Sequence, residues 1–246
     1  MAKRSILIFS ALFLFAASVD AQIFTHGFYP NKVALSFDDG PSGKYTEQVL
    51  DILKRYHIKA TFFVVGIKAE KEPELLKRIA DEGHDIGNHT FFHSKLSWIN
   101  DKKLISEIKM TSDFIIKTTG TADFLFRPPH GTLPYSKIKL IEDAGYNIVL
   151  WSVNADDFYK TGFGMRSPTS IANRVLSRIH GSDIILMHDD SEQTVESLPI
   201  IIWALKKRGY AFVPVSKLIV PGARSLSLEK PLRDPRPPAF LFRLGL

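Results

Sequence analysis

Short apolar runs alternate with longer amphipathic stretches through most of the chain, from Lys32 to Leu218. The apolar runs are typical of buried strands, and apolar residues spaced three and four apart are typical of helices. Strands are predicted at residues 33–37, 61–65, 85–87, 124–126, 148–153, 184–187 and 211–215. Helices are predicted at residues 49–56, 74–80, 104–118, 138–144, 171–179 and 195–207, and most are followed by a glycine that can end them.

Seven strands that alternate with helices predict a parallel sheet that is covered by helices. A (β/α) barrel and a doubly wound sheet would both produce this alternation. Several charged residues and histidines directly follow the predicted strands, and in (β/α) barrels the functional residues gather at the carboxyl ends of the strands. We therefore predict a single α/β domain with a barrel fold over residues 32–220, preceded by a short segment at 22–31.

The first 21 residues have the features of a secretory signal peptide. Two basic residues precede an apolar run at 6–17, and small side chains near Ala21 suit a signal peptidase. A retained membrane anchor is the alternative, but an uncharged span of about 13 residues falls short of the roughly 20 that cross a bilayer. We predict export, with cleavage before Gln22 and a secreted, periplasmic or cell-envelope location.

The net charge of +6 is distributed unevenly along the chain. Five basic and two acidic residues give the segment 221–246 a charge of +3, and the predicted signal peptide accounts for a further +1. Five prolines make this segment a basic tail that is poor in helix and strand propensity. The tail is either a solubilising extension or a contact for anionic wall polymers or membranes.

The sequence contains no cysteine, which excludes disulfides and thiolate ligands. Any transition-metal site must therefore use histidine, aspartate and glutamate. No phosphate-binding loop of the P-loop or dinucleotide type is present, no motif supports nucleic-acid binding, and nothing implies a protein partner.

Two motifs indicate a metal site. Asp38 and Asp39 stand side by side where the first strand breaks into a Gly-Pro turn. His89 and His93 are four residues apart, which on a helical turn places both imidazoles on one face. Either motif alone is weak evidence, but together they provide the two nitrogens and one oxygen of a catalytic zinc site that keeps a position open for water.

Three further motifs follow predicted strands. Arg127 begins RPPHG, in which two prolines restrict the backbone. Asp157 lies in NADDF at residues 154–158, and His188 lies in LMHD at residues 186–189. Taken singly, each motif could be an ordinary loop, but their joint order is specific.

In this order the five motifs resemble the polysaccharide deacetylases of carbohydrate esterase family four, over roughly residues 32–218. SFDDG stands for the family's usual TFDDG, HTFFH fits its HSxxH or HTxxH pattern, and LMHD fits its last motif. RPPHG departs from the commoner RPPYG, and Asn154 and Phe158 stand where aspartate and tryptophan are frequent. The departures lie at positions of substrate contact, so they affect specificity more than activity.

The resemblance implies a distorted seven-stranded (β/α) barrel and a role for each matching residue. Asp39, His89 and His93 would bind one divalent ion, zinc foremost, with cobalt or nickel as alternatives. Asp38 would be the general base, held by Arg127, and His188 the general acid, oriented by Asp157. The backbone N–H of His130 would stabilise the oxyanion, while Phe158 and Leu186 would line the sugar groove and the acetyl pocket.

The expected activity is hydrolysis of the N-acetyl group of N-acetylhexosamine units in a polysaccharide, with peptidoglycan or chitin-type chains as candidates. An O-acetyl esterase that acts on acetylated xylan or a similar glycan would use the same motifs. A carbohydrate-binding barrel without turnover is a third possibility, but it has no physical need for a complete set of catalytic side chains.

Overall fold

The computed structural model describes residues 23–158, 160–161 and 164–219. The predicted signal peptide and nearly all of the predicted basic tail lie outside the described residues. In the described part of the chain, no helix combines the length and the apolar character that a membrane span requires.

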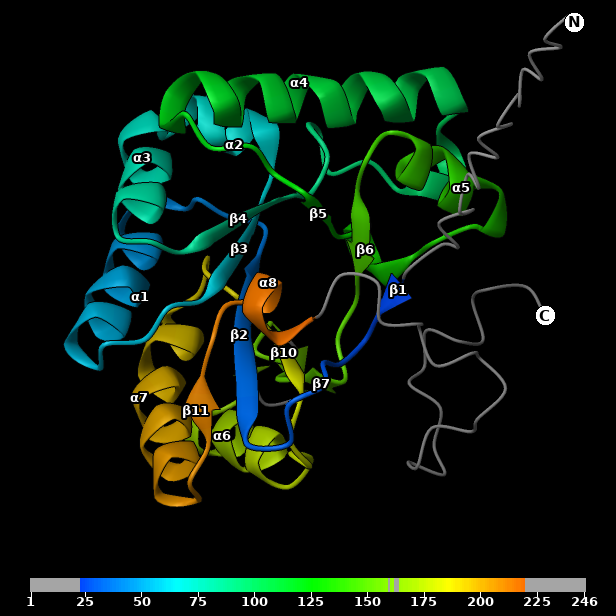
Figure 1. The fold of residues 1–246 in the computed structure, drawn as a ribbon. Coiled ribbons are helices and arrows are strands. Elements are labelled where there is room, and N and C mark those ends of the chain that lie inside the picture. The colour runs from blue at the N-terminus through cyan, green and yellow to red at the C-terminus, as the bar shows by residue number, and fades with distance from the viewer. Residues whose placement is uncertain (1–22, 159, 162–163, 220–246) are drawn as a thin grey trace, which may run out of the picture.

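The described strands form a parallel sheet in the order β1-β6-β5-β4-β3-β2-β10-β7, and β11 pairs with β2. Every pairing in this sheet is parallel. Figure 1 shows that the strands twist around a common centre rather than lying in one plane. The strands are β1 (Ile23–Phe24), β2 (Lys32–Asp38), β3 (Thr61–Val64), β4 (Asp85–Asn88), β5 (Leu125–Phe126), β6 (Asn147–Val149), β7 (Val153–Asn154), β10 (Ile184–His188) and β11 (Ala211–Phe212).

Helices surround the sheet, and the longest of them, α4, lies across one end of the molecule (Figure 1). A short antiparallel hairpin of β8 (Lys160–Thr161) and β9 (Gly164–Met165) stands apart from the main sheet. The helices are α1 (Gly43–Arg55), α2 (Gly66–Lys71), α3 (Pro73–Asp81), α4 (Asp101–Thr119), α5 (Tyr135–Asp143), α6 (Pro168–Leu176), α7 (Glu192–Lys207) and α8 (Val215–Leu218).

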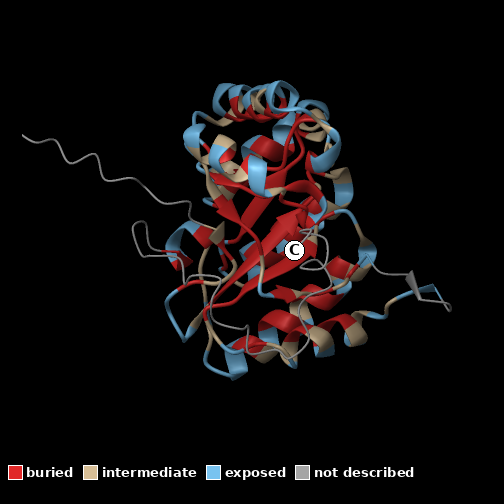
Figure 2. Ribbon diagram, turned by 90° about the vertical axis from the view of Figure 1, so that its right-hand side faces the viewer, coloured by how far each residue is buried: buried red, intermediate tan, exposed pale blue. Residues whose placement is uncertain are grey.

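Side-chain alternation along the strands separates an outer core from the barrel interior. In β2, Leu35 and Phe37 belong to the large apolar cluster that the helices cover, whereas Ala34 belongs to a second cluster with Phe63 and Ile184. Because successive side chains of a strand point to opposite faces, Ser36 and Asp38 share the inner face with Ala34. The central strands are buried, and exposure is concentrated on the outer surfaces of the helices (Figure 2).

The barrel prediction is confirmed, and the strand predicted at 148–153 requires a correction. The chain forms β6 and β7 there, with residues 150–152 outside any strand. β6 pairs with β5 and β1, whereas β7 pairs with β10, so the chain passes from one part of the sheet to another. The carbonyl groups of Val149 and Leu150 meanwhile accept hydrogen bonds from the buried side chain of Arg127.

A second correction concerns the end of the domain. The strand predicted at 211–215 is limited to β11, and the chain then turns into α8. Val215 and Leu218 of this helix are buried in the inner cluster, so apolar residues that resemble the end of a strand instead close the barrel interior.

Candidate active site

The carboxyl ends of β2 and β10 bring the two central side chains of the site together. Asp38 ends β2 and His188 ends β10, and the two residues are partners in the parallel register. Both belong to the inner face of the barrel because of the alternation described above. Immediately after β2, Asp39 adopts a left-handed φ of 72°, which turns the chain away from the strand.

Asp39, His89 and His93 converge as predicted. One ligand atom from each residue lies within 4.8 Å of the others. Oδ1 of Asp39 is 3.0 Å from Nε2 of His93 and 3.4 Å from Nε2 of His89. The three residues come from two loops, one after β2 and one after β4, and both of these strands pair with β3, which lies between them. The helical turn assumed for the two histidines was wrong, because they lie on a loop after β4 in which Thr90 and His93 have left-handed φ values.

A hydrogen bond on the side of the ring away from Asp39 fixes the orientation of His89. Nδ1 of its buried ring lies 2.7 Å from the backbone carbonyl oxygen of Arg127. An N–H donor at Nδ1 leaves the lone pair of Nε2 directed toward Asp39, which is the arrangement of a metal-ligating histidine.

The donor set fits a divalent cation. Oδ1 of Asp39 is buried and accepts no hydrogen bond of good geometry in the described structure, although two imidazole nitrogens are close to it. One carboxylate oxygen and two imidazole nitrogens that lie close together without hydrogen bonds between them are expected where all three atoms point at one metal position. Burial acts to raise the pKa of Asp39, but the adjacent His89 and His93 lower it well below its usual range.

Arg127 supports Asp38 from the interior of the barrel. Its guanidinium is fully buried, and Nη1 donates to Oδ1 of Asp38 at 2.6 Å and to Oγ of Ser36 at 2.9 Å. The ring of Phe63 lies under the guanidinium, with its centroid 4.0 Å from Cζ. Arg127 therefore lies against Asp38, as the family resemblance implied, and it also donates to the backbone carbonyl groups of Val149 and Leu150.

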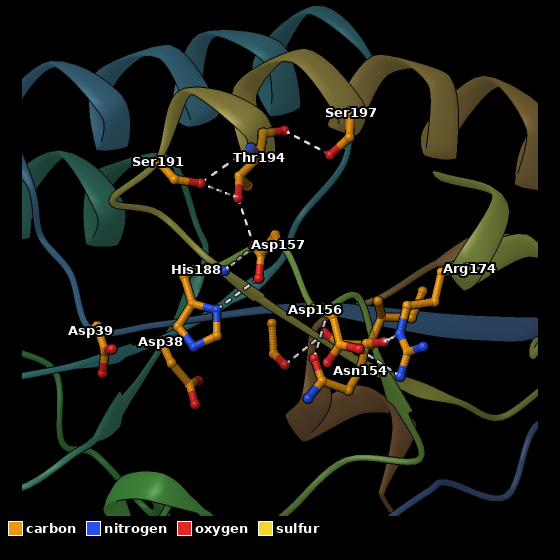
Figure 3. Close-up of polar contacts among 12 residues, drawn as sticks. Asp38, Asp39, Asn154, Asp156, Asp157, Arg174, His188, Ser191, Thr194 and Ser197 are labelled. Carbon is orange, nitrogen blue, oxygen red and sulfur yellow. Dashed lines mark hydrogen bonds and ion pairs between the residues drawn. The ribbon is translucent and has the colours of Figure 1, made fainter. Parts of the chain in front are cut away.

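Asp157 holds His188 by two bonds, which Figure 3 shows together with the bond from Thr194. Its Oδ1 lies 2.8 Å from Nδ1 of His188, and its Oδ2 accepts from the backbone N–H of His188 at 2.7 Å. Thr194, at the start of α7, donates its hydroxyl to Oδ2 at 2.6 Å. Burial lowers the pKa of His188, but the hydrogen bond and the charge of Asp157, together with the charges of Asp38 and Asp39, outweigh it and raise the pKa to about 9.

The loop that carries Asp157 has its own anchor. Asp156 has a left-handed φ of 53°, and its backbone N–H donates to the side-chain oxygen of Asn154. Arg174 of α6 donates to the carbonyl oxygen of Asn154 and forms an ion pair of 2.7 Å with Asp156. Figure 3 shows this second group beside the one around His188.

The three predicted substrate-contact residues surround the same centre. The ring of His130 lies edge-on to His93, with centroids 4.5 Å apart, and burial followed by the charge of His93 lowers the pKa of His130. Phe158 is half exposed, and its ring centroid is 4.8 Å from that of His188. Leu186 is buried in β10, two residues before His188 and on the same face of the strand.

Three supporting residues were not predicted from the sequence. Ser36 contacts Arg127, Thr194 contacts Asp157, and Glu107 is a fully buried carboxylate on α4. Ser36 could have been found from the sequence, because residues two apart on a strand share one face and Ser36 precedes Asp38 by two. Glu107 was identifiable as an acid within the apolar stripe of a predicted helix.

A family profile described as polysaccharide deacetylase matches residues 27–149. The chain is also 42% identical over 190 residues to a peptidoglycan-N-acetylglucosamine deacetylase of Bacillus cereus, an alignment that covers 76% of this chain and 87% of the relative. The chain belongs to the polysaccharide deacetylase family. This membership confirms the predicted family and the enzyme class, a hydrolase of N-acetyl amide bonds.

Two further matches support the same polysaccharide deacetylase assignment. The chain is 34% identical over 188 residues to the peptidoglycan-N-acetylmuramic acid deacetylase PdaA of Bacillus subtilis, covering 76% of this chain and 71% of the relative. The crystal structure of a peptidoglycan N-acetylglucosamine deacetylase in complex with a substituted N-oxidanyl-benzamide matches with a TM-score of 0.76 and 35% identity, covering 81% of this chain and 92% of the other.

Proposed function

We propose that this protein is a secreted, metal-dependent deacetylase that removes the acetyl group from N-acetylhexosamine units of peptidoglycan and releases acetate. The observation that carries the proposal is the placement of Asp38 and His188 as register partners beside the converging Asp39, His89 and His93. One small site thus holds a carboxylate, a protonated imidazole and a set of metal ligands, which are the groups that hydrolysis of an amide needs.

Asp39, His89 and His93 would hold the ion, with zinc the first candidate and cobalt or nickel as alternatives. When bound, such an ion polarises the acetyl carbonyl and lowers the pKa of a water molecule. The buried, unbonded Oδ1 of Asp39 and the fixed tautomer of His89 support this assignment.

Asp38 would take the proton from the attacking water. Its Oδ1 is occupied by Arg127, and its Oδ2 lies 3.8 Å from Nε2 of His89, on the side of the ligand set. The bond to Arg127 leaves one oxygen of the carboxylate available and limits its rotation. Asp38 is almost completely buried, so its proton transfers are shielded from bulk water.

His188 would give its proton to the departing amine. Because Asp157 raises the pKa of His188 to about 9, the imidazole is protonated at neutral pH, the state that a general acid must start from. An amide needs this acid more than an ester does, since a free amide anion is a very poor leaving group. The strong hold of Asp157 on His188 therefore favours N-deacetylation over O-deacetylation.

The backbone N–H of His130 would stabilise the developing negative charge on the acetyl oxygen. His130 and Gly131 have consecutive left-handed φ values of 60° and 63°. The N–H groups of Gly131 and Thr132 already donate to the carbonyl oxygens of Pro128 and Pro129, so the N–H of His130 is the amide of this loop that we assign to the oxyanion. Leu186 would line the acetyl pocket, and the half-exposed ring of Phe158 would contact the sugar.

Relatives that are named for N-acetylglucosamine and for N-acetylmuramic acid both support peptidoglycan as the substrate polymer. The predicted signal peptide at residues 1–21 supports export, which brings the enzyme to a wall polymer outside the membrane.

The test is acetate release from peptidoglycan, chitooligosaccharides and acetylxylan, measured beside the metal content of the purified protein. We expect about one divalent ion per chain and the highest kcat/KM on peptidoglycan. Faster release from acetylxylan would favour the esterase. A chain that binds no metal and releases no acetate after addition of zinc would contradict the hydrolase proposal altogether.

A further inference from the structure

Two of the three proposed metal ligands lie on one short, sharply bent loop. Between β4 and α4, Thr90 and His93 both have left-handed φ values, 62° and 57°. These conformations are uncommon for residues other than glycine, and they persist only where the surroundings enforce them. The position of the His93 imidazole thus depends on the groups that hold this loop.

The two histidines of the loop are supported differently. Nδ1 of His89 is bonded to the carbonyl oxygen of Arg127, and the ring of His89 is buried. In the part of the chain that the structure describes, Nδ1 of His93 has no such partner, and its side chain is 26% exposed. The ring of His93 packs against the rings of His89 and His130, but with no hydrogen bond at Nδ1 its direction also depends on the position of its backbone.

Backbone groups at the start of α2 hold the first half of the loop. The N–H of Gly66 donates to the carbonyl oxygen of Thr90, and that of Ile67 donates to the carbonyl oxygen of Phe91, both at 3.0 Å. These bonds end before His93, which leaves the second half to another support.

Glu107 supplies that support from α4. Its Oε2 accepts from the backbone N–H of Phe92 at 3.1 Å, and its Oε1 accepts from the hydroxyl of Ser94 at 2.7 Å. The two contacts lie on either side of His93 in the chain. A single carboxylate on a rigid helix thus fixes the residue before and the residue after a metal ligand.

Because Glu107 is buried, its hydrogen bonds to Phe92 and Ser94 are needed to offset the cost of removing its carboxylate from water. Its side chain is 0% exposed, and the nearest cation is Nζ of Lys103 at 3.8 Å. An ionised carboxylate away from water is costly unless its oxygens are well bonded. An apolar residue at this position of α4 would pack without that cost, but it would leave the N–H of Phe92 without a partner.

We infer that Glu107 is a positioning residue for metal binding, which orients His93 by holding Phe92 and Ser94. The inference rests on the proposed metal site. Glu107 itself contacts neither the donor atoms of the proposed ligands nor the substrate-contact residues, so it would act only through the loop.

The test compares the zinc affinity of variants by competition with a chromophoric chelator, and the d–d spectrum of the cobalt form reports the ligand geometry. We expect Glu107→Ala to weaken zinc binding about 10- to 100-fold, the loss that is typical when a partner supporting a ligand is removed. Glu107→Gln should recover most of the affinity, because its amide oxygen can accept from Phe92 and its NH2 group can donate to the hydroxyl of Ser94.

Ile115→Ala is the matched control. Ile115 is fully buried on the same helix, two turns further on, so its truncation lowers stability without touching the loop. We expect this variant to bind zinc as the wild type does. Ser94→Ala, which removes only one contact from a partly exposed residue, should give a smaller loss than Glu107→Ala and tests the inference even if the latter does not fold.

Wild-type affinity in both Glu107→Ala and Ser94→Ala would overturn the inference, as would an equal loss of affinity in Ile115→Ala. If Glu107→Ala yields no folded protein, wild-type affinity in Ser94→Ala alone overturns it. These outcomes leave the proposed function intact, because the wild type still binds its ion. A wild type that binds no zinc or cobalt would remove the metal site and this inference together.

Discussion

Asp38 and His188 are direct partners in the pairing of two adjacent parallel strands, β2 and β10. Each is held by an oppositely charged residue from elsewhere in the barrel, Arg127 for Asp38 and Asp157 for His188. Residues that are paired in register on one face of a sheet lie side by side, so the proposed base and acid can act on the same substrate bond. Arg127 stabilises the negative charge of Asp38, and Asp157 stabilises the positive charge of His188.

The two adjacent aspartates should respond differently to the same isosteric change. Asp39→Asn removes a ligand charge, so zinc affinity should fall by more than the roughly 10- to 100-fold expected for loss of a supporting residue. Asp38→Asn should keep about one ion per chain, while kcat falls about 10²- to 10⁴-fold with loss of the base. Elemental analysis and acetate release measure the two effects. Loss of metal from both variants would contradict the division of roles.

Asp157→Asn should shift the pH dependence of activity. His188 must be protonated to act as an acid, so in the wild type kcat/KM should fall as the pH rises through about 9. Without the carboxylate of Asp157, only the charges of Asp38 and Asp39 oppose the effect of burial, so the pKa of His188 should fall below the wild-type value. The alkaline limb of the kcat/KM profile should then move down by at least about one pH unit.

The raised pKa of His188 also makes the stability of the protein depend on pH. Because the pKa of His188 is raised in the folded state, its stabilising contribution is fully present below the ordinary value of 6.5 and is lost as the pH rises through about 9. The free energy of unfolding of the wild type, relative to Asp157→Asn, should decline over that range. A difference between the two proteins that does not change between pH 6 and 10 would argue against a protonated His188.

Arg127→Met should strongly destabilise the domain. The change leaves the carboxylate of Asp38 buried without its cation, and it leaves the carbonyl groups of Val149 and Leu150 without their side-chain donor. Removing one partner of a buried ion pair costs about 3–5 kcal/mol of unfolding free energy. Urea denaturation measures this loss.

Arg78→Met is the control for the arginine change. Arg78 forms ion pairs with Asp51 and Glu82, but it lies at the surface of α3 and is 29% exposed. Its loss should cost no more than about 1 kcal/mol, because solvent screens exposed pairs. Equal losses for the two arginines would show that burial of Arg127 does not matter.

Gly131→Ala should damage the loop that carries His130. Gly131 has a φ of 63°, and a Cβ atom there would lie 2.5 Å from the ring of Trp151. Gly145→Ala shares the left-handed backbone, with a φ of 91°, but its Cβ would meet no atom within 4 Å. Both changes carry the backbone penalty of about 1–2 kcal/mol, and Gly131→Ala adds an overpacking cost of about 1–3 kcal/mol.

Thermal denaturation and acetate release separate the two glycine variants. Gly145→Ala should lose stability but keep kcat, since it lies at the end of α5 and away from the site. Gly131→Ala should lose more stability and also lose kcat. A Gly131→Ala enzyme with wild-type turnover would argue against the oxyanion role of this loop.

Most of the elements were predictable because their signals are local. The helix predicted at 104–118 is α4, and the strand predicted at 184–187 is β10 with one added residue. The strand predicted at 148–153 was wrong, since an unbroken apolar run carries no sign of where one set of strand partners ends and the next begins. The side chain of Arg127, more than twenty residues away, takes the carbonyl oxygens at the point where β6 ends.

The sequence by itself determined the five motifs, their order and the candidate site residues within them, because motif spacing and the alternation of strands are properties of short segments. The proposed metal ligands were named from the motifs, and the Asp38–Arg127 and Asp157–His188 pairs were implied by the family resemblance of those motifs; the structure brings each of these sets together. The groups that the supporting residues contact emerged only from the tertiary structure. Glu107, Thr194 and the carbonyl of Arg127 act across distances of 13 to 38 residues in the chain, through burial and hydrogen bonds that exist only after the barrel has closed.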